Sequence, residues 1–177
     1  RYGNLRAREQ DEWVRKFDKA DQRCLAAWSL DCAERVLPLF EQVRPDDLRP
    51  RHALEVGRRW VETGAFGMPI VRSASLGAHA AAKEVTNAPA ACAAAHAAGQ
   101  AVATAHVAQH AYGGAYYALK ALAADGERAG AMGRVVSERE WQAQHLPEAL
   151  RTEIMNRLVV EDRRTGPFIT VIKGPGF

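Results

Sequence analysis

The sequence has few cysteines, and their number and spacing exclude several classes of small protein. The three cysteines, Cys24, Cys32 and Cys92, form neither an even set nor a CxxC pair. They therefore predict no disulfide framework and no zinc site of the paired-cysteine type. Free thiols persist in reducing compartments, so we expect buried, unpaired thiols in a cytoplasmic protein.

An excess of charge of one sign is also missing. The 24 basic and 21 acidic residues are interspersed and give a net charge of +3. Nucleic-acid-binding proteins usually gather Lys and Arg on one face, whereas the arginine pairs at 58–59 and 163–164 are isolated. No apolar run reaches the ~20 residues that a membrane-spanning helix needs. We therefore expect neither a nucleic-acid nor a membrane partner.

Alanine is abundant in the middle of the chain. From Ala78 to Ala124, 22 of the 47 residues are alanine by direct count. Alanine is the best helix former and allows helix axes to approach closely. The sequence predicts helix from Ala90 to about Ala124, with a candidate break at Gly113 and Gly114, and a tightly packed pair of antiparallel helices in this region.

Further helices are predicted on both sides of the alanine-rich region from apolar periodicity and capping residues. Asp21 is the expected N-cap of one of them, and Pro50 suits the first turn of a helix that ends near Gly64. Four helices are expected before or at the edge of this region, over 6–19, 21–39, 50–64 and 70–85. After it, a capping box at Ser137 and Glu140 predicts the start of another helix, and Pro147 opens the final one. The β-branched segment Phe168–Ile172 predicts an extended stretch that lies against the body or pairs with another chain.

These patterns predict an all-α protein. We expect a single domain over 1–177, built as a bundle of about six to eight helices around closely packed alanine-rich central helices. Its core would cover about 21–160, and residues 161–177 would form an extended tail.

Two histidines raise the question of a metal site. His106 and His110 are four residues apart in HVAQH, which places both rings on one face if the segment is helical. Val107 stands where an HExxH zinc motif carries its glutamate, so a third ligand would have to come from His79, Glu84 or Cys92. We favour the alternative, in which the rings pack between helices and hydrogen-bond there.

A charged set occupies two successive predicted helices and their connection. It can form an ion-pair network between the helices, which we favour, or present alternating charges to a protein partner. Its members are Asp31, Glu34, Arg35, Arg49, Arg51, Glu55 and Arg58. Cys32 lies beside two of these acids and on an apolar stripe, which predicts a structural thiol and not a nucleophile.

Four blocks of the sequence carry a family resemblance. They are WSLDCAERVLPLFE (28–41), PDDLRPRHALEVGRRW (45–60), AHAAAKE (78–84) and AAGQAVATAHVAQHAYGGAYYALKA (97–121). Together they resemble a family of small helical bacterial immunity proteins over roughly 25–120, and more loosely as far as the helix that begins at Pro147. The resemblance implies a protein that binds a cognate toxin and blocks it, with no catalytic residues and no cofactor.

The leading hypothesis is therefore a non-enzymatic bacterial immunity protein whose partner is a protein toxin. We expect its binding surface to be polar and to lie on exposed loops and helix ends, and the sequence assigns no residue to it. One alternative is a metal-binding protein or metal-dependent enzyme that uses His79, His106 and His110. The other is a structural homodimer in which Phe168–Ile172 crosses the interface.

Overall fold

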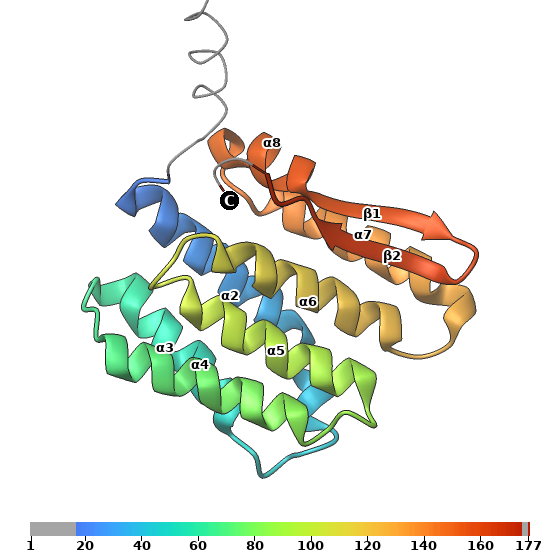
Figure 1. Cartoon of the computed structure of the whole chain (residues 1–177), viewed down its shortest axis with the longest axis horizontal. Coiled ribbons are helices and arrows are strands. Elements are labelled where there is room, and N and C mark those ends of the chain that lie inside the picture. Colours follow the sequence, from blue (N-terminus) through green and yellow to red (C-terminus); the bar gives the residue numbers. More distant parts are fainter. Residues whose placement is uncertain (1–16, 175–176) are drawn as a thin grey trace, which may run out of the picture.

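The computed structural model describes residues 17–174 and 177, and it confirms the all-α prediction (Figure 1). The part of the predicted helix over 6–19 that precedes residue 17 lies outside the described residues. Seven α-helices are followed by one small hairpin in the described part of the chain. They are α2 (Lys19–Glu41), α3 (Arg49–Thr63), α4 (Met68–Lys83), α5 (Pro89–Ala103), α6 (His110–Ala124), α7 (Ala131–Gln144) and α8 (Glu148–Arg157), with a 3₁₀ turn η1 (Arg128–Gly130) before α7. The hairpin consists of β1 (Leu158–Arg163) and β2 (Gly166–Val171).

Helix α5 lies at the centre of the bundle, where it packs against α2, α3, α4 and α6. Its buried residues are alanines apart from Gly99 and Val102, so its neighbours approach close to its backbone. Residues near the end of α5 meet residues near the start of α6, because Gln100 contacts both His110 and Gly113. The predicted antiparallel pair is therefore confirmed (Figure 1).

The break between these two helices was predicted in the wrong place. It lies at 104–109 and not at Gly113 and Gly114, both of which are inside α6. The side-chain amide of Gln22, in α2, donates to the carbonyl oxygens of Thr104 at 2.8 Å and Ala105 at 3.2 Å. This contact with a distant helix supports the turn, while Gly114 allows α6 to approach Ser29 of α2 closely.

The ends of α2 and α3 follow local capping chemistry. The carboxylate of Asp18 accepts a hydrogen bond from the backbone N–H of Asp21 at 2.7 Å, so the N-cap is Asp18 and the prediction of Asp21 was three residues late. Helix α2 continues past Pro38 to Glu41. Helix α3 has proline in its first turn and ends at Gly64, whose φ of 68° is left-handed, as predicted.

The C-terminal part differs most from the prediction. The predicted capping box at Ser137 was wrong, because α7 runs through this residue and buries Glu138 and Gln142 on its inner face. The core does not stay helical to residue 160, since β1 begins at Leu158, which pairs with Val171 of β2. The 168–172 segment therefore finds its strand partner largely within the chain, and the hairpin packs against α6 and α7.

One hydrophobic core joins these elements. Trp28 and Phe40 of α2 are among its largest side chains, and Ile154 of α8 and Leu158 of β1 extend it to the C-terminal part. Within the described part of the chain, no helix combines the length and the apolar character needed to cross a membrane.

Candidate functional site: a groove beside the α5–α6 pair

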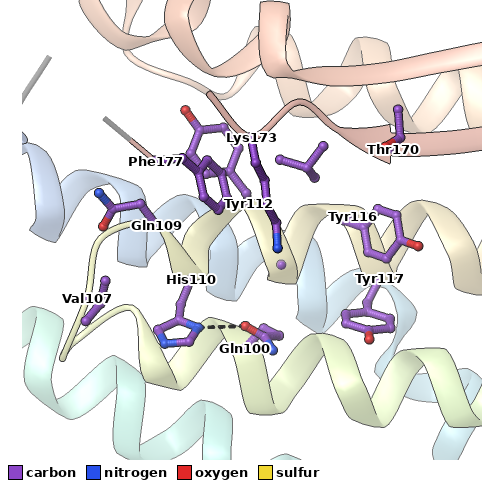
Figure 2. Close-up of a pocket in the computed structure, with 12 residues that line it drawn as sticks. Gln100, Val107, Gln109, His110, Tyr112, Tyr116, Tyr117, Thr170, Lys173 and Phe177 are labelled. Atoms are coloured by element: carbon purple, nitrogen blue, oxygen red, sulfur yellow. Dashed lines mark hydrogen bonds between the residues drawn. The ribbon is translucent and has the colours of Figure 1, made fainter. Parts of the chain in front are cut away.

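His106 and His110 do not share a helix face. His106 lies exposed in the turn between α5 and α6, whereas His110 is the first residue of α6 and is half-buried. The Nδ1–H of His110 donates to Oε1 of Gln100 at 2.8 Å (Figure 2). The packing interpretation is therefore confirmed for His110, which joins α6 to α5, and was wrong for His106.

His79 pairs with His96 of α5 and not with the other candidate metal ligands, His106 and His110. Its Nδ1 lies 2.8 Å from Nδ1 of His96, so α4 and α5 are joined by a histidine–histidine hydrogen bond. The ring of His79 also lies over Gly99, where a Cβ atom would come within 2.8–3.0 Å of the ring. A side chain at position 99 would therefore displace the ring of His79 from its present position.

Burial keeps these histidines neutral. It lowers the pKa of His79 to about 4, with the neighbouring His96, His110 and Lys83 contributing in the same direction. Burial is also the first cause of the lowered pKa of His96 and of His110. At pH 7 the three rings act as hydrogen-bonding groups and not as charges.

The candidate metal ligands are not gathered into one site. His79 pairs with His96, which was not among the candidates, and Glu84 pairs with Arg49. Burial raises the pKa of the Cys92 thiol, which disfavours the thiolate that a metal binds. Among the residues that the structure describes, no group of three or more His, Cys, Asp and Glu side chains is arranged to hold a metal ion.

The main concave feature of this region is a groove of about 510 Å³ between the α5–α6 pair and the C-terminal segment. Gln100, His110 and Tyr116 lie on the helical wall, and Lys173 and Phe177 lie on the opposite wall (Figure 2). We call this feature the groove. Sequence reasoning missed it because its walls lie more than 50 residues apart in the chain.

A row of rings continues from the groove across the surface of three helices. The ring centroids of His79 and His96 lie 5.0 Å apart, and those of His96 and Tyr117 also lie 5.0 Å apart. Tyr116 packs edge-on against Tyr117 at 5.1 Å, and Nζ of Lys120 lies 5.8 Å from the Tyr116 ring. We call these four rings the ring row; the adjacent tyrosines of AYYAL were the signal for its α6 end.

The predicted ion-pair network between α2 and α3 is present. Arg58 of α3 binds both Asp31 and Glu34 of α2 at 2.6 Å. Arg51 and Glu41 form a second pair between the same helices. The charges of this face are therefore largely paired with each other.

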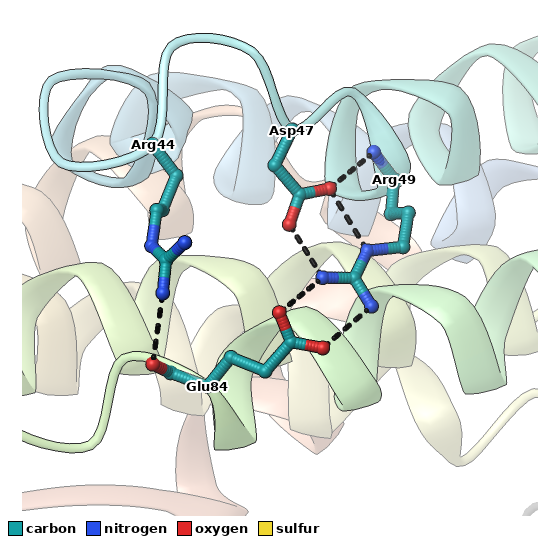
Figure 3. A network of polar contacts seen from close by, with 4 residues as sticks. All are labelled: Arg44, Asp47, Arg49 and Glu84. Atoms are coloured by element: carbon teal, nitrogen blue, oxygen red, sulfur yellow. Dashed lines mark hydrogen bonds and ion pairs between the residues drawn. The ribbon is translucent and has the colours of Figure 1, made fainter.

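Arg49 and Arg35, both members of the predicted set, bind partners that the sequence did not suggest. Arg49 joins the carboxylate of Asp47 to that of Glu84 at the end of α4, and Arg44 donates to the backbone oxygen of Glu84 (Figure 3). Hydrogen bonds from Arg49 lower the pKa of Asp47 and of Glu84. Arg49 therefore links the α2–α3 connection to the end of α4 through its two ion pairs.

Arg35 pairs with Glu138 of α7 at 2.9 Å and lies 4.0 Å above the ring of Trp141. Burial raises the pKa of Glu138, and Arg35 opposes that effect. The pair therefore joins α2 to α7 away from the groove.

The cysteines give a mixed outcome. Cys32 is fully buried, and burial together with Glu138 and Asp31 raises the pKa of its thiol, so the structural interpretation is confirmed. Cys92 is partly buried, but Cys24 is exposed, contrary to the expectation that all three thiols are buried.

Comparison with known proteins identifies the family. No curated protein and no solved structure matches the chain. One family model matches residues 15–149, which cover the helices from α2 to α7 and the start of α8, and this span exceeds half of the chain. The chain belongs to the Imm-5 like putative immunity protein family.

Proposed function

We propose that this protein is a bacterial immunity protein that binds a cognate protein toxin and holds it inactive without catalysis. The observation that carries this proposal is the family match over 15–149, which includes the helical wall of the groove. The partner would be a toxin made by the same or a neighbouring cell. We place the complex in the cytoplasm, where exposed Cys24 would stay reduced.

We propose that the toxin docks on the groove and the ring row. Tyrosine is enriched at the centres of protein interfaces because it buries a large area and loses little side-chain entropy. Tyr116 and Tyr117 are half-buried, and both line the groove. The contact of Tyr117 with His96 fixes its ring before any partner arrives. A rigid surface of this kind loses less conformational entropy on binding.

The α2–α3 face is less suited to this role. Its carboxylates and guanidinium groups are largely engaged with each other, as Arg58 with Asp31 and Glu34 shows. A partner that docked there would have to compete with these ion pairs. This difference favours the groove over the charged helices as the contact surface.

The test is protection of growing cells. Each open reading frame adjacent to this gene is induced in a laboratory bacterium with and without this chain, and growth is followed. The proposal expects one product that stops growth alone and is tolerated when the chain is present. It also expects the purified pair to bind in calorimetry. If no adjacent product is both toxic and neutralised, the proposal is wrong.

Substitutions then locate the surface. Tyr116→Ala and Tyr117→Ala should each weaken binding about tenfold or more, as removal of an interface anchor does. Phe66→Ala is the matched control, because Phe66 is 47% exposed in the loop between α3 and α4 and does not line the groove. If Phe66→Ala weakens binding and the tyrosine variants do not, the surface lies elsewhere.

A further inference from the structure

The two walls of the groove have different origins in the chain. The helical wall, with Gln100, His110 and Tyr116, lies within the family match over 15–149. The opposite wall is formed by Thr170, Val171, Lys173 and Phe177, all beyond that match. The shared helices therefore provide one wall, and a segment outside the matched region provides the other.

Among the described residues that line the groove, Lys173 has the one charged side chain. Figure 2 shows its side chain extending from the C-terminal segment into the groove, towards Gln100 of α5. Its Nζ lies 5.4 Å from the ring of Phe177. Among the described residues, no ion pair to Lys173 is present, and residues 89–124 contain no Asp or Glu at all.

The other polar side chains that line the groove are neutral hydrogen-bonding groups. Gln100, Gln109 and Thr170 provide amides and a hydroxyl, and Tyr116 provides a phenol. The ring of His110 is neutral at pH 7 because burial and the adjacent His106 lower its pKa. A cation among neutral donors, beside an aromatic ring, complements an anion that accepts hydrogen bonds on both of its oxygens.

We propose that an Asp or Glu side chain of the toxin enters the groove and pairs with Lys173, so that the docking surface of the toxin is acidic. This inference rests on the proposed function. Lys173 is the specificity-determining residue, because it lies on the wall outside the family match while the helical wall supplies uncharged contacts. A toxin with a basic surface would meet an unpaired lysine in the groove and would be rejected.

The first experiment needs no toxin. Amide resonances of the full chain are followed by nuclear magnetic resonance during titration with N-acetyl-glutamate N-methylamide. The matched probe is N-acetyl-glutamine N-methylamide, and a third titration uses inorganic phosphate. We expect the glutamate probe to shift the resonances of Lys173, Thr170 and Gly113 in a saturable way, and the glutamine probe to leave them unchanged.

Variants decide whether Lys173 is responsible. Lys173→Gln should abolish these shifts, whereas Arg72→Gln, which removes an exposed charge of α4 outside the groove, should preserve them. The proposal is overturned if the shifts survive in Lys173→Gln, if they scatter over the surface, or if the groove shows no shifts. It is also overturned if phosphate binds the groove as well as the glutamate probe does, since the site would then take anions in general.

The second experiment uses the toxin identified by growth protection. Lys173→Glu should weaken binding about tenfold or more, and Lys173→Gln should weaken it less, because reversal adds repulsion to the lost pair. Arg72→Glu changes the net charge equally and should leave the affinity unchanged. If the toxin binds Lys173→Glu as tightly as the unmodified chain, the inference is wrong and the proposed function stands. If no toxin is neutralised, the proposed function fails, and the probe titrations alone decide whether the groove takes a carboxylate.

Discussion

Acid should weaken the contact between α4 and α5, because His79 and His96 meet there. With both rings neutral, one Nδ1–H donates to the other Nδ1 across 2.8 Å. Protonation of both rings turns each Nδ1 into a donor and places two positive charges side by side, with Lys83 and His110 adding to the repulsion. Folding lowers the pKa of His79 and of His96. As the pH falls, the unfolded chain therefore binds these protons before the folded protein does, and the folded state loses stability.

The size of the effect follows from the pKa of His79. A value of about 4 in the folded protein, against about 6.5 in the unfolded chain, corresponds to roughly 2 kcal/mol of lost stability at pH 5. The ring is only partly buried, so solvent screening reduces this figure to about 1 kcal/mol. The loss of stability begins as the pH falls below the pKa of His79 in the unfolded chain and levels off below its pKa in the folded protein.

Urea unfolding at pH 7.5 and pH 5.0 measures this loss. The comparison is between the unmodified chain, the double variant His79→Gln/His96→Gln and the control His52→Gln, whose side chain is 63% exposed on α3. Between the two pH values, the unmodified chain and the control should lose about 1 kcal/mol more than the double variant. Equal losses in all three proteins would refute the reasoning, because the pair would then contribute nothing to the pH dependence.

Three further predictions concern packing and exposure. Gly99→Ala should destabilise the protein in thermal unfolding, because overpacking against the ring of His79 costs about 1–3 kcal/mol and outweighs a helix-propensity gain of about 1 kcal/mol. The control Gly133→Ala, where the added methyl group meets open space, should be neutral or stabilising. Tyr112→Phe should leave the unfolding free energy unchanged or raise it by up to about 1 kcal/mol, because the buried hydroxyl has no hydrogen-bond partner in the described residues; a clear loss would reveal one. Ellman's reagent should label Cys24 in the folded protein and Cys32 only after denaturation, and labelling of native Cys32 would contradict its burial.

The sequence predicted those helix ends that depend on local chemistry. Pro50 and Gly64 mark α3 because a proline is tolerated in the first turn and a glycine adopts the left-handed closing conformation. The break at 104–109 was missed because TAHVAQ contains neither residue type. At this break the backbone carbonyl oxygens of Thr104 and Ala105 accept hydrogen bonds from the side-chain amide of Gln22, which is 82 residues away from Thr104 in the chain. No local pattern carries that information.

The candidate site was predictable only in part. The prediction that His110 packs between helices was correct, because a histidine in an alanine-rich helix pair needs a partner and Gln100 is within reach. The strand partner of 168–172 was missed, since LVVEDR follows α8 with no breaker between them. Without β1, nothing placed β2 and Lys173 opposite α5 and α6, so the groove could not be foreseen.

The late position of the hairpin in the chain has a consequence for protein synthesis. Helices α2–α6 end at residue 124, so the alanine-rich centre can assemble while residues 158–177 are still to be translated. At that stage the groove has one wall and lacks Lys173. A growing chain would therefore be largely folded before its groove is complete, and under the proposed function it could bind a toxin there only after the hairpin has left the ribosome.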